Sequence, residues 1–232
     1  MTMAKALPPF DPLFVCRALE PFLVDGRRER IDAVIDARLA GLTVVIENLH
    51  DPHNGAAVLR SAEAFGLQTV HVVETAERFR FSSDVSQGCE KWLDVERHPT
   101  FAAAVNRLRA GGFALYAAAP EAEASWEELD FSRPAAIVVG NEHAGLTAEA
   151  LAAVDVRFRI PMAGMTRSLN LSVAAALIIS RAAAARRLAL RRPADGIQPT
   201  GDLDEAERLR LRARFYAASV RGADQILARA RL

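Results

Sequence analysis

Polar side chains able to bind ligands or do chemistry gather in three segments, each following a short apolar run. The first, residues 47–66, has turn residues at Asn54-Gly55 and then a helical stretch that carries Arg60. The start of a helix offers free N–H groups and a positive dipole end, and a guanidinium can grip a phosphate or a carboxylate with two hydrogen bonds. The segment therefore predicts anion binding, although a turn followed by an amphipathic helix with a surface arginine gives the same pattern.

The second segment, residues 138–146 (VVGNEHAGL), is a buried apolar strand that runs into a polar triplet between two glycines. Gly140 and Gly145 let the backbone approach a flat ligand, while Asn141, Glu142 and His143 offer hydrogen bonds. The spacing matches neither G-x-G-x-x-G nor G-x-x-x-x-G-K-[ST], which disfavours a dinucleotide site and a P-loop. A plain strand-to-helix turn with Glu142 near the helix start is the structural alternative.

The third segment, residues 160–176, reads IPMAGMTRSLNLSVAAA and places small polar groups at the mouth of an apolar helix. Pro161 ends the strand and Gly164 permits a sharp turn. Ser168, Asn170 and Ser172 are neutral donors and acceptors, which suit an adenine edge or a ribose hydroxyl and do not suit a metal. Either Ser168 or Asn170 alone also fits a simple helix N-cap.

The sequence lacks the motifs of metal sites, cysteine chemistry and serine hydrolases. The five histidines show no H-E-x-x-H or comparable ligand spacing, so we predict no metal site. Cys16 and Cys89 form neither a C-x-x-C pair nor a disulfide framework. No G-x-S-x-G elbow is present, which disfavours a hydrolase.

The elements that position the three segments follow from the alternation of β-branched runs with alanine-rich stretches. Strands are predicted over residues 43–46, 69–73, 113–117, 136–139 and 156–160, and helices over 56–65, 101–110, 148–154 and 171–190. This βαβ rhythm predicts an α/β fold, a mostly parallel sheet with helices on both faces. The polar segments follow strands, where ligands bind in open parallel sheets.

Helical arms are predicted at both ends. Residues 27–39 have apolar positions at helical spacing, and a last arginine-rich helix covers 204–232 after a break at 192–201. We therefore divide the chain into an N-terminal extension with an amphipathic helix (1–40), a catalytic domain (41–190) and a basic C-terminal helical extension (191–232). Residues 1–25 receive no role. The packing anchors expected in the last helix are Leu203, Leu209, Leu211, Phe215 and Ile226.

Charge is distributed unevenly. The formal net charge is zero, which alone argues against a polyanion partner, but residues 181–232 hold twelve arginines and six acidic residues. A basic end suits a polyanion, while a solvated helix face with ion pairs gives the same composition. With 51% hydrophobic residues the chain should fold. It has no membrane-length apolar run or secretory signal, so we expect a cytoplasmic location and no membrane partner.

Taken together, the three segments resemble the SPOUT superfamily of methyltransferases. The matching patterns are N-x-x-x-x-x-R at residues 54–60, G-N-E-x-x-G-L at 140–146 and I-P-M-x-G-x-x-x-S-L-N-L-S at 160–172. The stretch S-Q-G-x-x-K-W at 86–92 and the basic terminal helices resemble the TrmH-like family, which methylates the ribose 2'-oxygen of the D-loop guanosine of tRNA. Within that stretch Trp92 either stacks on a base or packs in a core or interface, and packing is favoured.

The resemblance implies a homodimer whose catalytic domain ends in a deep trefoil knot. It also implies that S-adenosylmethionine is the methyl donor and that no metal is required. Cofactor contacts are implied for Gly140, Asn141, Glu142, Ile160, Met162 and Leu169.

The resemblance further implies that Arg60 activates the ribose hydroxyl and that Asn54 positions it, with Glu142, Ser168 and Asn170 completing the catalytic site. A guanidinium stays protonated, so gripping the adjacent phosphate is an easier role for Arg60 than acting as a base. Contacts to RNA are implied for Arg27, Arg28, Arg30, Lys91, Arg167, Arg186 and Arg187.

Three other functions remain possible at this point. Methylation of ribosomal RNA by the same chemistry ranks second, because about 40 residues before the first strand are too few for the N-terminal RNA-binding domain usual in that group. A catalytically silent RNA-binding protein on the same fold would be expected to lack Arg60 or Asn170, and both are present. A nucleotide-dependent oxidoreductase is disfavoured by the missing glycine fingerprint.

Overall fold

The computed structural model describes residues 10–75, 88–191 and 201–230. Its strands are β1 (Leu42–Glu47), β2 (Thr69–Val73), β3 (Asp94–His98), β4 (Ala114–Ala118), β5 (Ala124–Ser125), β6 (Ala135–Val139) and β7 (Val156–Arg159). In the described part of the chain they form one sheet in the order β3-β2-β1-β6-β4-β7-β5, and each pairing is parallel. The predicted parallel sheet is confirmed.

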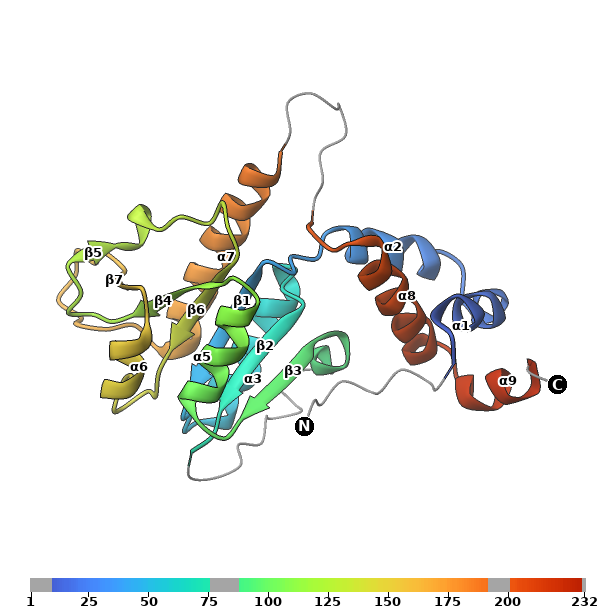
Figure 1. The fold of residues 1–232 in the computed structure, drawn as a ribbon, viewed down its shortest axis with the longest axis horizontal. Coiled ribbons are helices and arrows are strands. Elements are labelled where there is room, and N and C mark those ends of the chain that lie inside the picture. Colours follow the sequence, from blue (N-terminus) through green and yellow to red (C-terminus); the bar gives the residue numbers. More distant parts are fainter. Residues whose placement is uncertain (1–9, 76–87, 192–200, 231–232) are drawn as a thin grey trace.

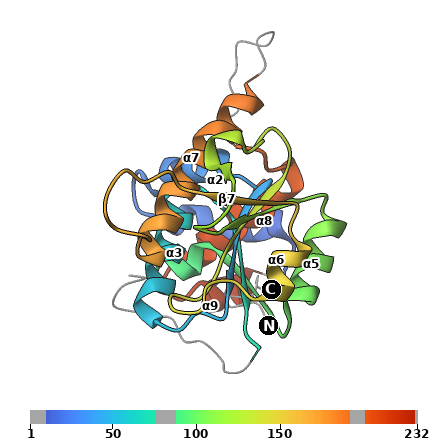
Figure 2. The same cartoon turned by 90° about the vertical axis from the view of Figure 1, so that its left-hand side faces the viewer.

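Helices cover both faces of this sheet, as predicted (Figures 1 and 2). On one face lie α3 (Pro52–Ala64) and α7 (Leu171–Leu190), and on the other lie α5 (Phe101–Ala110) and α6 (Ala148–Ala153). Successive strand residues point to opposite faces, so Val44 packs with α3 and α7 while Val45 packs with α5. Because both faces are covered, central strands such as β6 (AAIVV) are apolar throughout.

Polar loop residues begin these four helices by capping free backbone N–H groups. Asp51 caps α3, Thr100 caps α5, Thr147 caps α6 and Asn170 caps α7. Two of the four caps, Asp51 and Asn170, lie in the polar segments identified in the sequence, and Thr147 directly follows the second segment. The segments therefore set where helices start as well as what they can bind.

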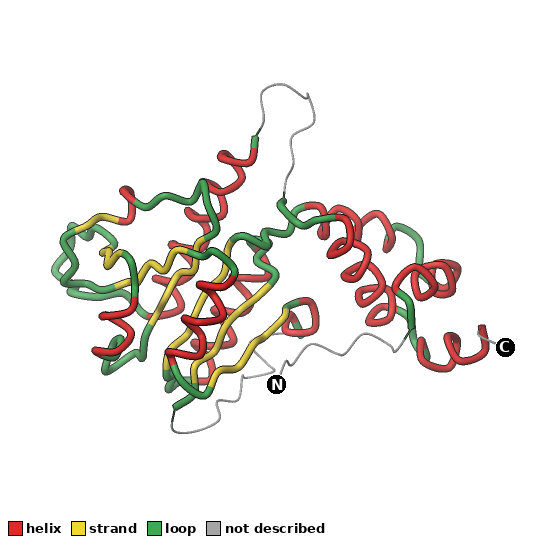
Figure 3. The backbone as a smooth tube through the Cα atoms, in the orientation of Figure 1, coloured by secondary structure: helices red, strands yellow, loops and turns green. Residues whose placement is uncertain are grey.

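The helices near the two ends of the chain pack on each other around a separate apolar core (Figure 3). They are α1 (Pro12–Leu19), α2 (Arg27–Asp36), α8 (Glu205–Ser219) and α9 (Ala223–Ala230), and the short 3-10 turns of the structure are η1 (Glu20–Phe22), η2 (Cys89–Trp92) and η3 (Trp126–Glu128). Among the expected anchors, Leu203, Leu211 and Phe215 are buried, and Leu209 and Ile226 pack against them. Residues 10–25 thus contribute packing to this core.

Some details of the sequence prediction were wrong or incomplete. The expected single C-terminal helix is two, because the chain turns at Gly222, whose φ is 71°. Strands β3 and β5 were not predicted. Among the described strands, β3 (DVERH) pairs with β2 alone at the sheet edge, and its partly exposed positions carry polar residues. Of the predicted break at 192–201, only Gly201 lies within the described residues.

Arginines of the C-terminal region pair with acidic residues inside the protein. Arg186 donates to Asp202 Oδ2 at 2.8 and 3.0 Å, and the other carboxylate oxygen of Asp202 accepts from the backbone N–H groups of Ala40 and Gly41. In α8, Arg208 and Arg212 pair with Asp36 and Asp32 of α2. The basic composition of this end is therefore used largely to hold the terminal helices in place.

Both cysteines are free and buried, and burial raises the pKa of each thiol to about 11. Protonated, enclosed thiols are poor nucleophiles, which agrees with the absence of cysteine chemistry in the sequence patterns. Among the helices of the described residues, none combines the length and hydropathy that a bilayer span requires.

Replacement of Asp202 by alanine should destabilise the fold. Arg186 and Asp202 are 9% and 11% exposed, so Asp202→Ala leaves a buried guanidinium without its carboxylate. We expect the free energy of unfolding, measured by urea titration, to fall by about 3 kcal/mol. The matched control is Asp25→Ala, an exposed aspartate, which should change it by less than about 0.5 kcal/mol. Equal stability of the two variants would contradict the structural role of the Arg186–Asp202 pair.

Candidate functional site

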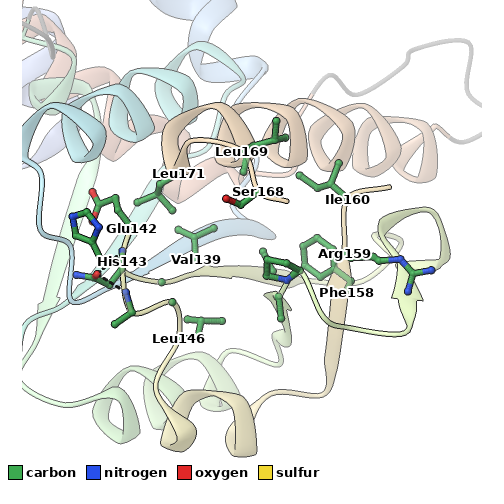
Figure 4. Close-up of a pocket in the computed structure, with 18 of the residues that line it drawn as sticks. Val139, Glu142, His143, Leu146, Phe158, Arg159, Ile160, Ser168, Leu169 and Leu171 are labelled. Carbon is green, nitrogen blue, oxygen red and sulfur yellow. Dashed lines mark hydrogen bonds between the residues drawn. The ribbon is translucent and has the colours of Figure 1, made fainter. Parts of the chain in front are cut away.

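A cavity of about 390 Å³ opens at the carboxyl ends of β4, β6 and β7 (Figure 4). Its walls come from the loops after these three strands and from the start of α7. The predicted cofactor and catalytic residues that line it are Gly140, Asn141, Glu142, Ile160, Met162, Ser168 and Leu169. The second and third sequence segments thus lie on one cavity, in the place where ligands bind in parallel α/β sheets.

The loop after β6 is held in a tight turn. Asn141 and Gly145 exchange two backbone hydrogen bonds of 2.9 and 3.0 Å, and Gly145 has a φ of 70°. A Cβ at Gly140 would overlap the backbone of Gly145, so this position requires glycine. The Asn141 side chain donates to Asn48 O at 2.7 Å and accepts from the N–H groups of His143 and Ala144. These bonds fix the loop that lines the cavity.

Glu142 joins this loop to the first polar segment. Its carboxylate accepts from the backbone N–H groups of His50 and Asp51 at 3.1 and 3.2 Å and from Asn54 Nδ2 at 3.0 Å. Partial burial acts to raise the pKa of Glu142, but the hydrogen bonds from Asn54 and the backbone outweigh it and hold the pKa below its ordinary value. Glu142 is therefore a carboxylate at neutral pH.

Asn170 extends the same network to the third segment. Its Nδ2 donates to Asn54 Oδ1 at 3.1 Å, and its Oδ1 accepts from Ser172 N at 2.9 Å and Ser172 Oγ at 2.6 Å. Asn170 thus caps α7 and also contacts Asn54. The N-cap role considered for Asn170 is confirmed, and its catalytic role stays a prediction.

Arg60 does not line the cavity. It is exposed on α3, beyond Asn54, and it forms no hydrogen bond or ion pair with any residue that the structure describes. The structure therefore brings Asn54, Glu142 and Asn170 together and places Ser168 on the cavity wall. Arg60, on the same helix as Asn54, is exposed and outside this group.

The cavity combines apolar walls with a few polar groups, as small-molecule sites do. Figure 4 shows Glu142 and His143 at one end and Phe158 and Ile160 toward the other. Such walls suit an aromatic ring plane, and the polar loop groups suit its hydrogen-bonding edge. Sequence reasoning missed the lining residues after β4, Ala118 to Pro120, because nothing in their composition is polar.

Sequence reasoning also missed Glu47. It is 1% exposed at the end of β1, and its carboxylate accepts from Thr147 N at 2.9 Å and Thr147 Oγ1 at 2.6 Å. This pair joins the first loop to the start of α6, which follows the second loop. The sequence did contain a signal for this pair: an acidic residue at the end of an apolar strand needs a hydrogen-bonding partner when it is buried.

A second cavity, of about 360 Å³, lies between the terminal helices and the C-terminal end of α3. Arg27, Arg30 and Lys91 line it, together with Trp92. Among the described residues that line it, Glu63 is the one acidic residue and is paired with Arg38, so positive charge predominates there. Trp92 is half-buried and packs edge-on against the Phe215 ring, with 4.9 Å between the centroids, which confirms that it packs at an interface.

The other residues predicted to contact RNA lie in different surroundings. Arg28 is exposed and pairs with Glu20, and Arg167 is exposed in the loop before α7. Arg186 is buried against Asp202, and Arg187 donates to two backbone carbonyl oxygens. The last two residues stabilise the fold, so the structure does not favour a role for them in binding RNA.

Comparison with known proteins gives one family and several similar enzymes. Residues 41–180 match the SpoU rRNA Methylase family. The chain is 40% identical over 159 residues to the tRNA (guanosine(18)-2'-O)-methyltransferase of Thermus thermophilus, an alignment that spans 68% of this chain and 82% of that enzyme.

Solved structures of TrmH and SpoU enzymes are also similar to this chain. The Aquifex aeolicus TrmH/SpoU tRNA modifying enzyme superposes with a TM-score of 0.72 at 26% identity, covering 88% of this chain and 98% of the other. The SpoU methyltransferase AviRb from Streptomyces viridochromogenes, solved with the cofactor AdoMet, gives a TM-score of 0.57 at 29% identity over 62% of this chain and 60% of that one.

The depressed pKa of Glu142 predicts how its contribution depends on pH. A carboxyl group whose pKa is lower in the folded protein stabilises it above the unfolded pKa, near 4.5, and loses this contribution as pH falls through the folded value. The stability difference between wild type and Glu142→Gln should therefore be constant from about pH 6 to 8. It should shrink under acid, as urea titrations at each pH will show.

The matched control for that comparison is Glu121→Gln, which alters an exposed glutamate outside the network. Its stability difference from wild type should be small at every pH. A Glu142→Gln difference that does not change under acid would show that the Glu142 charge is not held by its hydrogen bonds.

Proposed function

Because the chain belongs to the SpoU rRNA methylase family, we propose that it transfers a methyl group from S-adenosylmethionine to a ribose 2'-hydroxyl of RNA, with the D-loop guanosine 18 of tRNA as its target. The observation that carries the proposal is the shared cavity of the second and third loops, joined to Asn54 through Glu142 and Asn170. The tRNA substrate rests on the names of the relatives from Thermus thermophilus and Escherichia coli.

The cavity fits S-adenosylmethionine. Its volume of about 390 Å³ lies in the range of small-molecule sites, and the glycine at position 140 brings backbone groups to the surface of the cavity. Backbone and side-chain groups of Gly140, Asn141, Ile160, Met162 and Leu169 would hold the adenosine portion. When bound, this cofactor supplies an electrophilic methyl group on a sulfonium.

The chain's own residues must then orient the ribose hydroxyl for in-line attack and help it to lose its proton. Arg60 is exposed and unpaired among the described residues, which suits a clamp on the phosphate next to the target ribose. A guanidinium stays protonated at neutral pH, so Arg60 acts by charge and geometry in this proposal.

Asn54 is a positioning residue in this scheme. Its Nδ2 is held by Glu142 and its Oδ1 by Asn170, so both ends of the amide are fixed. This arrangement leaves Asn54 one orientation and aligns the start of α3 with the cavity. Ser168 on the cavity wall offers a neutral hydroxyl to the substrate ribose.

The proposal includes a homodimer and a knotted catalytic domain of residues 41–190 between helical extensions. An exposed apolar surface supports the dimer: Met165 is fully exposed before α7, and Val173 and Leu177, one turn apart on α7, are 48% and 43% exposed. Such residues are commonly covered by a partner. A cytoplasmic location follows from the proposed substrate.

The second cavity supports the RNA-binding part of the proposal. Arg27, Arg30 and Lys91 face one hollow with little opposing charge, which suits a phosphate backbone. Exposed Arg28 and Arg167 could add contacts. We do not include Arg186 or Arg187, because their guanidinium groups are bonded inside the fold.

Methylation of ribosomal RNA is the second candidate, favoured by the description of the matching family. The test is methyl transfer from labelled S-adenosylmethionine to unmodified tRNA and to ribosomal RNA, with nucleoside mapping of the product. We expect 2'-O-methylguanosine in the tRNA D-loop. Label only in ribosomal RNA would favour the second candidate, and cofactor binding without transfer to either would favour a silent RNA-binding protein.

Arg60→Ala should reduce methyl transfer to tRNA by about 100-fold or more, since the substrate would lose its phosphate clamp. Binding of S-adenosylmethionine, measured by calorimetry, should not change, because Arg60 does not line the cavity. A comparison with Arg17→Ala, another exposed arginine, controls for loss of surface charge. Wild-type turnover in Arg60→Ala would refute its assignment.

The double variant Arg30→Ala/Lys91→Ala should weaken tRNA binding and reduce the slope of log affinity against log salt by about 1 for each lost phosphate contact. Filter binding over a salt series measures both quantities. Arg229→Ala, which removes an exposed arginine of α9, is the control. An unchanged slope in the double variant would exclude the second cavity from the RNA contact surface.

A further inference from the structure

Three side chains with metal-binding atoms lie together at the edge of the sheet, outside the cofactor cavity. His71 is on β2, and Glu96 and His98 are on the neighbouring edge strand β3, where Glu96 lies opposite His71 in the parallel register. Residues two apart on a strand share a face, so Glu96 and His98 point the same way. That face is covered by α5, which is beside β2 and β3 in Figure 1.

The distances within this cluster suit a single metal ion. His71 Nδ1 lies 2.9 Å from His98 Nε2 and 3.7 Å from Glu96 Oε2, and all three ligand atoms lie within 4.8 Å of one another. Zinc held tetrahedrally at about 2.0–2.1 Å from each ligand sets the ligand atoms about 3.3 Å apart. To reach that spacing the two imidazoles must separate slightly and the partly exposed Glu96 side chain must move closer to His71.

The Glu96 carboxylate is contacted by Arg107 of α5, with Arg107 Nε 3.3 Å from Oε2. An outer partner of this kind orients a ligating carboxylate.

The cluster is reachable from solvent and separate from the methyl-transfer site. His71 is buried, whereas Glu96 and His98 are partly exposed, which leaves an entry path and room for water as a fourth ligand. Strand β2 lies two strands from β6, or about 10 Å across the sheet. None of the three residues lines the cofactor cavity. A bound ion would therefore act on the fold by linking the edge strand to β2.

We propose that His71, Glu96 and His98 form a binding site for one divalent zinc-type ion that fastens the edge strand β3 to the sheet. Two imidazoles and one carboxylate are a ligand set that zinc accepts, with an open position for water. The sequence patterns did not reveal this site, because its ligands come from two strands that only the parallel pairing brings together.

The test is to titrate the full-length, chelator-stripped protein with zinc sulfate against a chromophoric chelator and to follow thermal unfolding in parallel. We expect one zinc per chain at micromolar or tighter affinity, and a melting temperature that rises with zinc. Cobalt(II) in place of zinc should give the intense visible bands of a tetrahedral site. His98→Ala and Glu96→Gln should abolish these effects.

His53→Gln removes an exposed histidine outside the cluster and is the matched control, so it should keep the stoichiometry of wild type. Circular dichroism without metal checks that each variant folds. No zinc bound by wild type, or zinc binding that survives His98→Ala, would overturn the proposal. Either result would leave the two histidines as a hydrogen-bonded pair. Methyl-transfer activity is not needed for this test.

Discussion

The Glu142 carboxylate holds together the loops on which the proposed function depends. The loops after β1 and β6 leave the sheet at neighbouring strands, and three N–H donors of the first converge on this one side chain of the second. Charge-assisted hydrogen bonds of this kind are stronger than neutral ones and keep Glu142 ionised. Asn54 in turn accepts a hydrogen bond from Asn170, which caps α7, so the start of α7 is held in the same network. A single ionised group thus sets the positions of three loops and one helix.

Buried arginines hold the terminal helices against the sheet. Arg38 is fully buried and donates to Leu67 O and Glu63, while Arg214 of α8 donates to Asp94 at the start of β3 and to Trp92 O. With Arg186, Arg208 and Arg212, which also form ion pairs within the fold, Arg214 uses part of the positive charge of the C-terminal region. Within the described residues, Arg30 and Lys91 at the second cavity and Arg167 before α7 form no ion pair, and none of them lies in the arginine-rich C-terminal region. Net composition is therefore a poor guide to the RNA surface.

Sequence periodicity correctly predicted elements whose apolar residues are buried against neighbouring elements. Strand β2 and helices α5 and α7 occur over the predicted residues, because their apolar patterns match a buried position. Edge strand β3 was not predicted, because polar residues occupy its partly exposed positions. Helix α1 was not predicted either, although Asp11 and Pro12 form a standard helix start.

The candidate site was predicted in part for similar reasons. The loop motifs, through their resemblance to the SPOUT methyltransferases, located several of the residues that line the cavity. The pairing of Glu47 with Thr147 and the meeting of His71 with His98 could not be predicted, since each joins residues far apart in the sequence. Only the strand order places them together.

The central claim is that the cavity between the second and third loops holds the methyl donor. The most direct measurement is a crystal structure of the protein grown with S-adenosylhomocysteine. The account predicts the nucleoside against the loop of Gly140 and Asn141, with Ile160 and Leu169 opposite it. A ligand bound elsewhere, or a cavity filled by its own side chains in the crystal, would contradict the account.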